Sequence, residues 1–204
     1  MRINQALDDI SALRLQMARS TEFRGYGPAT LAITGGLAAA AALAQAVFIP
    51  APIAAIAPYL ILWSATALVS VVLIAIEAIR RSRKTHLILA DDMLAAAAGQ
   101  FVPAAFTGTM LTLTLVHSAP ETIWMLPGLW QLILSLGMFA ACRTLPKPIA
   151  LVPAWYLATG LACLMYARGD HALSPLAMGL PFAIGQSLAA VLLLYSYRGS
   201  RDQT

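Results

Sequence analysis

The chain has 204 residues, of which 60% are hydrophobic and only 11% are charged. Soluble domains carry about 25% charged residues, so this composition excludes a water-soluble globular protein. The net charge of +4 does not indicate nucleic-acid binding, because excess Lys and Arg in a membrane protein normally mark its cytoplasmic loops.

Residues 1–27 are predicted to form a cytoplasmic amphipathic helix followed by a linker. Apolar residues recur there at spacings of three and four, which gives one apolar stripe. The charges on this helix are nearly balanced, whereas a membrane-surface helix carries a basic excess opposite its stripe. Docking on protein is therefore favoured, either on the chain's own helices, on a second copy or on a separate partner. The expected contact residues are Leu7, Ile10, Leu13 and Met17.

Five runs of the chain contain no Asp, Glu, Lys or Arg, namely residues 25–76, 93–120, 122–142, 148–167 and 171–197. A hydrocarbon core of about 30 Å takes about 20 apolar residues of helix, so the first run holds two spans and each other run holds one. Pro50, Pro52 and Pro58 place a loop inside the first run. We therefore predict an all-α polytopic membrane protein. Its six transmembrane helices are expected near residues 28–48, 58–79, 94–117, 122–142, 149–167 and 174–197, within one domain at 28–197 that precedes a cytoplasmic tail at 198–204.

Basic residues alternate between the two sides of this predicted bundle. Of the 13 Lys and Arg residues, only Arg168 falls in a loop after the first, third or fifth span. The positive-inside rule then places both termini in the cytoplasm. Because Ala- and Arg-rich usage fits a bacterial inner membrane, we expect a multi-pass protein of that membrane.

The spans carry a weak internal repeat. Pro28-Ala29 is followed by Thr34-Gly35, and Pro153-Ala154 is followed by Thr159-Gly160 at the same offset. This pattern suggests three in-out-in helical hairpins related about an axis along the membrane normal, as in parallel-repeat transporters. Pro and Gly are common in membrane helices, so chance recurrence is the competing explanation.

Uncharged polar residues form stripes on the predicted spans, at multiples of three and four positions. They either hydrogen-bond between helices, which is the default in membranes, or line a wet cavity. In the second case the solute path would include Gln100, Thr107, Gln131, Ser135 and Gln186. Among acidic residues only Glu77 lies within a span, and Arg80 and Arg81 at i+3 and i+4 predict a local ion pair.

Aromatic residues at the span ends, Tyr59 and Trp124 among them, predict a belt at the membrane interfaces. Trp130 and Trp155 are expected deeper in the membrane, where they would contact either neighbouring helices or a ligand. The two cysteines, Cys142 and Cys163, fall at opposite ends of their spans and cannot form a disulfide within the chain.

Metal-binding and catalytic signals are weak. His117, Glu121, Asp170 and His171 fall on one side of the predicted membrane and are of types that bind zinc, but no HExxH-like spacing accompanies them. No serine has the GxSG-like setting of an intramembrane protease, and Gly35-Gly36 lies inside a span rather than in a phosphate loop. We therefore expect no enzyme activity, no cofactor and no nucleic-acid partner.

Three segments carry a resemblance to known proteins: ARSTEFRGYGPATLA at the first span, ETIWMLPGLWQ at the fourth and SPLAMGLPFAIGQ at the sixth. Together they resemble a group of small, uncharacterised six-span bacterial inner-membrane proteins. The resemblance covers the whole chain and implies the same six-span fold. It implies no active residues and no particular function.

Two classes of function fit these features. The first is a non-enzymatic membrane protein that senses, anchors or regulates through a cytoplasmic partner. The second is a transporter of small solutes or lipophilic compounds that uses the polar stripes. In both cases the chain would contact membrane lipid, and in the first it would also bind a cytoplasmic protein or a second copy of itself.

The distribution of basic residues predicts the orientation of every loop. Reporter fusions after Thr204, near Pro52 and near Asp170 should report inside, outside and outside. Paired cytoplasm-active and periplasm-active reporters at each site provide the measurement and its internal control. An outside signal after Thr204 would contradict the six-span orientation.

Overall fold

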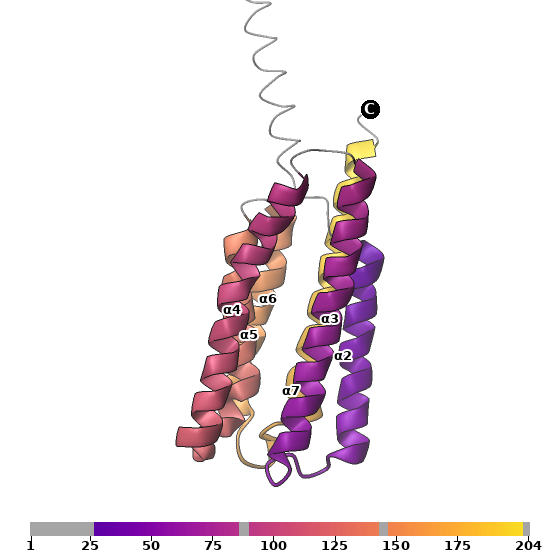
Figure 1. Cartoon of the computed structure of the whole chain (residues 1–204). Coiled ribbons are helices and arrows are strands. Elements are labelled where there is room, and N and C mark those ends of the chain that lie inside the picture. Colours follow the sequence, from indigo (N-terminus) through magenta and orange to yellow (C-terminus); the bar gives the residue numbers. More distant parts are fainter. Residues whose placement is uncertain (1–26, 86–89, 143–146, 202–204) are drawn as a thin grey trace, which may run out of the picture.

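The computed structural model describes residues 27–85, 90–142 and 147–201 (Figure 1). These residues form no strand. The helices are α2 (Pro28–Phe48), α3 (Ile56–Thr85), α4 (Ala90–Ser118), α5 (Leu126–Ala141), α6 (Leu151–Tyr166) and α7 (Pro175–Arg201), with short 3₁₀ helices η1 (Pro120–Met125), η3 (Lys147–Ala150) and η4 (Gly169–His171) between them. Six of the described segments are long and apolar enough to span a membrane, which confirms an all-α, six-span protein. The amphipathic helix predicted for residues 1–27, with Leu7, Ile10, Leu13 and Met17, lies outside the described residues apart from Gly27.

Three helices are longer than their apolar runs predict. Helix α3 continues to Thr85, α4 begins at Ala90, and α7 continues to Arg201. Hydropathy marks only the part of a helix that is buried in lipid, whereas residues such as Arg and Lys propagate a helix equally well in water. The predicted boundaries therefore underestimate the helices where they leave the membrane at the basic end.

The fourth span differs in form from the continuous helix predicted for 122–142. It begins as the 3₁₀ helix η1, and α5 starts only at Leu126. Pro127 has no backbone N–H, so an α-helix that began earlier would lack its bond to the carbonyl of Ile123. The N–H of Leu126 bonds to that carbonyl instead, in the tighter 3₁₀ pattern.

The contacts between the six long helices follow the chain order and close into a ring through the contact of α2 with α7. In Figure 1, α2, α3 and α7 stand together, as do α4, α5 and α6. Consecutive helices pack against one another, and the most extensive interfaces join α2 to α7 and α5 to α6. The pair α3 and α4 shares the smallest interface around the ring. Each predicted hairpin, α2–α3, α4–α5 and α6–α7, is therefore a packed pair, although the largest interfaces lie between hairpins.

Glycines allow the two largest interfaces to form. A Cβ atom added to Gly128 on α5 would lie 2.8 Å from the carbonyl oxygen of Gly160 on α6. In the interface of α2 with α7, a Cβ added to Gly35 would lie 3.1 Å from the carbonyl oxygen of Ala183. Lipid tails are as apolar as leucine, so membrane helices associate through close packing of this kind rather than through the hydrophobic effect.

The core is divided into two clusters along the bundle axis. One is built around the fully buried ring of Tyr156, together with Val152 and Leu193. The other surrounds Tyr59 and Trp63 on α3 and reaches Leu173 in the connection between α6 and α7. Tyr59 is 0% exposed, so its predicted place in an interfacial belt is wrong. Its ring turns inward because α2 and α7 cover that side of α3.

The close approach of α5 and α6 predicts that substitution by alanine destabilises the protein at Gly128 but not at Gly36. Gly128→Ala should destabilise the protein by about 1–3 kcal/mol, because the added methyl group meets a backbone carbonyl and the Leu164 side chain. Gly36→Ala is the matched control, since nothing lies within 4 Å of the position its Cβ would take. Unfolding in a denaturing-detergent titration measures both changes. Equal stability of the two variants would contradict the packing of α5 on α6.

Candidate functional site

A cluster of polar side chains lies where α5, α6 and α7 meet, around Pro181. Proline has no N–H, so a proline inside α7 leaves the carbonyl of Ala177 without its helical hydrogen bond. The amide Nε2 of Gln131 on α5 donates a 2.9 Å hydrogen bond to that carbonyl. Gln131 is fully buried and also donates to the carbonyl of Pro127 on its own helix. The side chain therefore replaces the bond that Pro181 removes.

Cys163 on α6 takes part in the same cluster. Its Sγ lies 3.4 Å from the Ala177 carbonyl oxygen and 3.5 Å from Gln131 Nε2. It is a free cysteine, as is Cys142, in agreement with the prediction that the two form no disulfide. Three helices thus meet at one carbonyl group, that of Ala177.

Two further side chains bond to backbone carbonyls near prolines in the same region. Ser135 Oγ on α5 donates a 2.8 Å hydrogen bond to the carbonyl of Pro153 on α6. Trp155 Nε1 on α6 donates a 2.9 Å bond to the carbonyl of Pro181 on α7. Together with Gln131, these residues connect the helices through bonds that lipid cannot supply.

A second polar cluster, centred on Gln45, fixes the connection between α6 and α7. Gln45 is fully buried on α2, and its Nε2 donates a 2.7 Å hydrogen bond to the carbonyl of Leu173. Its Oε1 accepts a 2.7 Å bond from Trp63 Nε1 on α3. Leu173 has φ +56°, a left-handed conformation that costs a residue with a Cβ about 1–2 kcal/mol. The bond from Gln45 and the burial of the leucine side chain offset that strain.

Some buried polar atoms in the described part of the chain lack a hydrogen bond. Gln131 Oε1 and the Tyr59 hydroxyl have no partner. The Tyr156 hydroxyl packs against Gly185 and has no bond of acceptable geometry, although Gln186 lies beside it. The interior therefore contains polar atoms beyond those used in helix packing.

Four of the five residues predicted for a solute path have side chains that the structure describes. Gln131 and Ser135 lie on one face of α5, and Gln186 is half-buried on α7. Thr107 lies on the exposed side of α4. Gln100 belongs to the first half of α4, and its side chain lies outside the described residues. These four residues thus differ in burial, from fully buried Gln131 and Ser135 to exposed Thr107.

The predicted zinc ligands lie at the end of the bundle opposite to the end of α3. His117 ends α4, Glu121 lies in η1, and Asp170 and His171 lie in η4. Within the ranges that the structure describes, no three His, Cys, Asp or Glu side chains approach closely enough to hold a metal ion. At the same end, the Arg168 guanidinium stacks 4.7 Å from the ring centre of Trp124.

Glu77 forms the predicted ion pair with Arg81, at 2.6 Å between Arg81 Nε and Glu77 Oε1. The pair packs against Gly27, where a Cβ would lie 3.0 Å from the glutamate side chain. This contact places the start of α2 beside the end of α3. Gly27 therefore lies at the basic end of the bundle.

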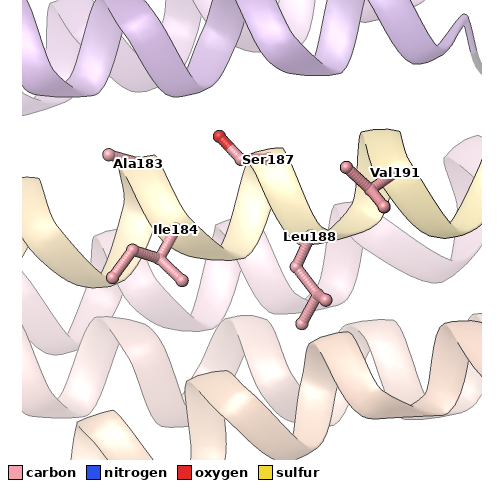
Figure 2. Close-up of a pocket in the computed structure, with 5 residues that line it drawn as sticks. All are labelled: Ala183, Ile184, Ser187, Leu188 and Val191. Atoms are coloured by element: carbon pink, nitrogen blue, oxygen red, sulfur yellow. The ribbon is translucent and has the colours of Figure 1, made fainter.

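A shallow groove of about 430 Å³ runs along one face of α7. Ala183, Ile184, Ser187, Leu188 and Val191 line it (Figure 2). These residues lie on the side of α7 opposite to the buried Gly185 and Ala189, so the groove faces the surrounding lipid. The hydroxyl group of Ser187 is the only polar side-chain group among these five lining residues, so they include no acid, base or metal ligand that could act on a substrate.

No protein-family model, curated protein or solved structure matches this chain. The contacts of its own side chains are therefore the basis for any functional proposal. The sequence pattern placed Gln131 and Ser135 among the candidates but did not reveal their partners. Gln131 bonds to the carbonyl that Pro181 leaves free, and Ser135 bonds to the carbonyl of Pro153. A proline inside a span together with an amide on another span is the signal that could have revealed the Gln131 bond.

The bond between Gln131 and Ala177 predicts coupling between Gln131 and Pro181. Gln131→Leu should cost about 0.6–1.7 kcal/mol of stability in the wild-type background. In a Pro181→Ala background the new N–H can bond to Ala177, so the same change should cost measurably less. Denaturing-detergent unfolding of the four proteins measures the coupling. Pro103→Ala, which removes a helix proline from α4, is the control and should be additive with Gln131→Leu; additivity for Pro181 would contradict the assignment.

Proposed function

We propose that this chain is a non-enzymatic bacterial inner-membrane protein that senses, anchors or regulates through a cytoplasmic partner. The observation that carries the proposal is the use of the buried polar side chains. Gln131, Ser135 and Gln45 all donate to backbone carbonyls of other segments. Side chains used in this way hold helices together rather than bind a solute. This use supports a membrane domain whose role is to hold its cytoplasmic end in place for a partner.

A transporter would use these groups differently. Transporters commonly break their helices at mid-membrane and leave the freed backbone groups to bind substrate or ions. In α7 the corresponding carbonyl, that of Ala177, is taken by Gln131 and Cys163. This supports packing over transport, and we keep transport as the alternative.

The non-enzymatic part of the proposal rests on where reactive side chains lie. His117, Glu121 and His171 are exposed at one end of the bundle, and no three His, Cys, Asp or Glu side chains of the described residues come together as a metal site would require. The cysteine thiol of Cys163 is engaged with Gln131 and Ala177.

The proposed orientation has both termini in the cytoplasm. All Lys and Arg residues in the described ranges, except Arg168, lie at the end of the bundle where α2 begins and α7 ends. The positive-inside rule assigns that end to the cytoplasm. Gly27, at the start of α2, lies beside Glu77 and Arg81, so a helix in the segment before it would be presented on the same side.

The partner contact is proposed to lie on the apolar stripe of residues 3–19. Leu7→Asp with Ile10→Asp should remove at least nine-tenths of a specifically co-purifying cytoplasmic protein, because two charges would enter the contact. Gln5→Asp with Ala12→Asp adds the same charges opposite the stripe and should leave the yield unchanged. Quantitative mass spectrometry after purification in mild detergent provides the measurement.

Equal recovery with both double variants would contradict a partner role for this segment. Transport makes a separate prediction that uses Gln186, whose side chain is free of the Pro181 cluster. If the chain carried a solute, Gln186→Leu would lower flux at unchanged membrane abundance. The regulatory proposal would be supported over transport by two results together. The Gln186→Leu variant would grow normally on every compound tested, and the Leu7→Asp, Ile10→Asp variant would lose the co-purifying partner.

A further inference from the structure

Two fully buried polar atoms on different helices lack a hydrogen-bond partner among the residues that the structure describes. They are the hydroxyl of Tyr59 on α3 and Oε1 of Gln131 on α5, and both side chains are 0% exposed. A polar group that is buried without a hydrogen bond destabilises a protein, so native structures rarely keep one. Each of these atoms therefore requires a partner that the described side chains do not provide.

The two residues belong to one layer near the non-basic end of the bundle. Tyr59 is the fourth residue of α3, and Gln131 is the sixth residue of α5. Ala177 and Cys163, which both bond to Gln131, lie within one turn of the same end of α7 and α6. At about 1.5 Å per residue, all four residues lie within about 9 Å of that end of their helices.

Packing contacts bring Tyr59 toward Gln131 within this layer. The hydrophobic cluster around Tyr59 reaches Trp130 on α5, which is the chain neighbour of Gln131. The Tyr59 hydroxyl also lies within electrostatic range of the Cys163 thiol, and Cys163 Sγ is 3.5 Å from Gln131 Nε2. The hydroxyl and the amide oxygen therefore face the same part of the interior.

Water suits these two atoms better than a cation does. An amide oxygen only accepts hydrogen bonds, whereas a tyrosine hydroxyl can donate one and accept another. A buried water molecule typically makes about three hydrogen bonds, so it can donate to the amide oxygen and bond to the hydroxyl at once. A cation would need oxygen ligands with free lone pairs. The nearby carbonyl of Ala177 already accepts from Gln131 Nε2 and from Cys163 Sγ.

We propose that an ordered water molecule binds between the Tyr59 hydroxyl and Gln131 Oε1. Helices α3 and α5 are not neighbours in the ring of contacts, so this water joins them across the interior of the bundle. It also connects α3 to the Pro181 cluster, because Gln131 bonds to the Ala177 carbonyl on α7. The site lies within two turns of the non-basic end, which lets it exchange water with the solvent beyond that end.

X-ray radiolysis in heavy-oxygen water tests for the water directly. Ionised water labels the side chains that it touches, and mass spectrometry of the full chain, reconstituted in lipid nanodiscs, locates the heavy oxygen. Tyr59 should be labelled, because the site holds water against it. Tyr156 is the matched control, since it is equally buried but its hydroxyl packs directly against Gly185, and it should stay unlabelled. Equal labelling of the two tyrosines would overturn the proposal.

Stability in two backgrounds provides an independent measurement. With the water bound, Tyr59→Phe removes one of its bonds and should raise the unfolding equilibrium constant about threefold. In a Gln131→Leu background the water has lost its acceptor, so Tyr59→Phe removes an unpaired hydroxyl and should lower that constant instead. Tyr156→Phe is the control and should have the same effect in both backgrounds. Denaturing-detergent unfolding measures these changes.

Two further results would overturn the proposal. A stabilising effect of Tyr59→Phe in the wild-type background would show that no water is bound to the hydroxyl. A stability that rises with sodium concentration at constant ionic strength, and does so only while Gln131 is present, would indicate a cation at the site. If the Gln131→Leu variant does not fold, the labelling contrast between Tyr59 and Tyr156 in the wild type still separates the two outcomes.

Discussion

The bundle depends on the requirement that every backbone polar group inside a membrane finds a partner within the protein. Pro181 breaks that condition in α7, and Gln131 restores it from another helix. The position of α5 against α7 is therefore tied to one carbonyl group. Ser135 and Trp155 add bonds between helices at the carbonyls of Pro153 and Pro181 themselves.

Close backbone packing adds to these bonds. The approach of Gly128 to Gly160, and of Gly35 to Ala183, brings helix backbones into direct contact. Individual hydrogen bonds between membrane helices contribute only about 0.6 kcal/mol on average, so the extended contact surfaces are needed as well. The two effects coincide between α5 and α6, where Ser135 bonds to the Pro153 carbonyl and Gly128 approaches Gly160.

The fold could be predicted because lipid imposes a length and a composition on every span. The first span, Pro28–Phe48, agrees at both ends with the range expected from its uncharged run. The contacts of the interior could not be predicted, since they depend on which helix faces which. Tyr59 illustrates this: a tyrosine at a span end is typical of an interface, yet α2 and α7 bury it. The spacing of Gln131 and Ser135 placed both on one polar face of their span. Their partners, the carbonyls of Ala177 on α7 and Pro153 on α6, could be identified only once the neighbours of α5 were known.

The ring has a consequence for biosynthesis. The largest interface joins α2, the first span of the described chain, to α7, the last. A ribosome adds about 5–20 residues per second, so on the order of ten seconds separate the completion of these two helices. Throughout that interval Gly35 and its neighbours on α2 face lipid or the insertion machinery rather than α7. The bundle closes only after the final span is inserted, and a chain that stops before α7 leaves its first helix without its main partner.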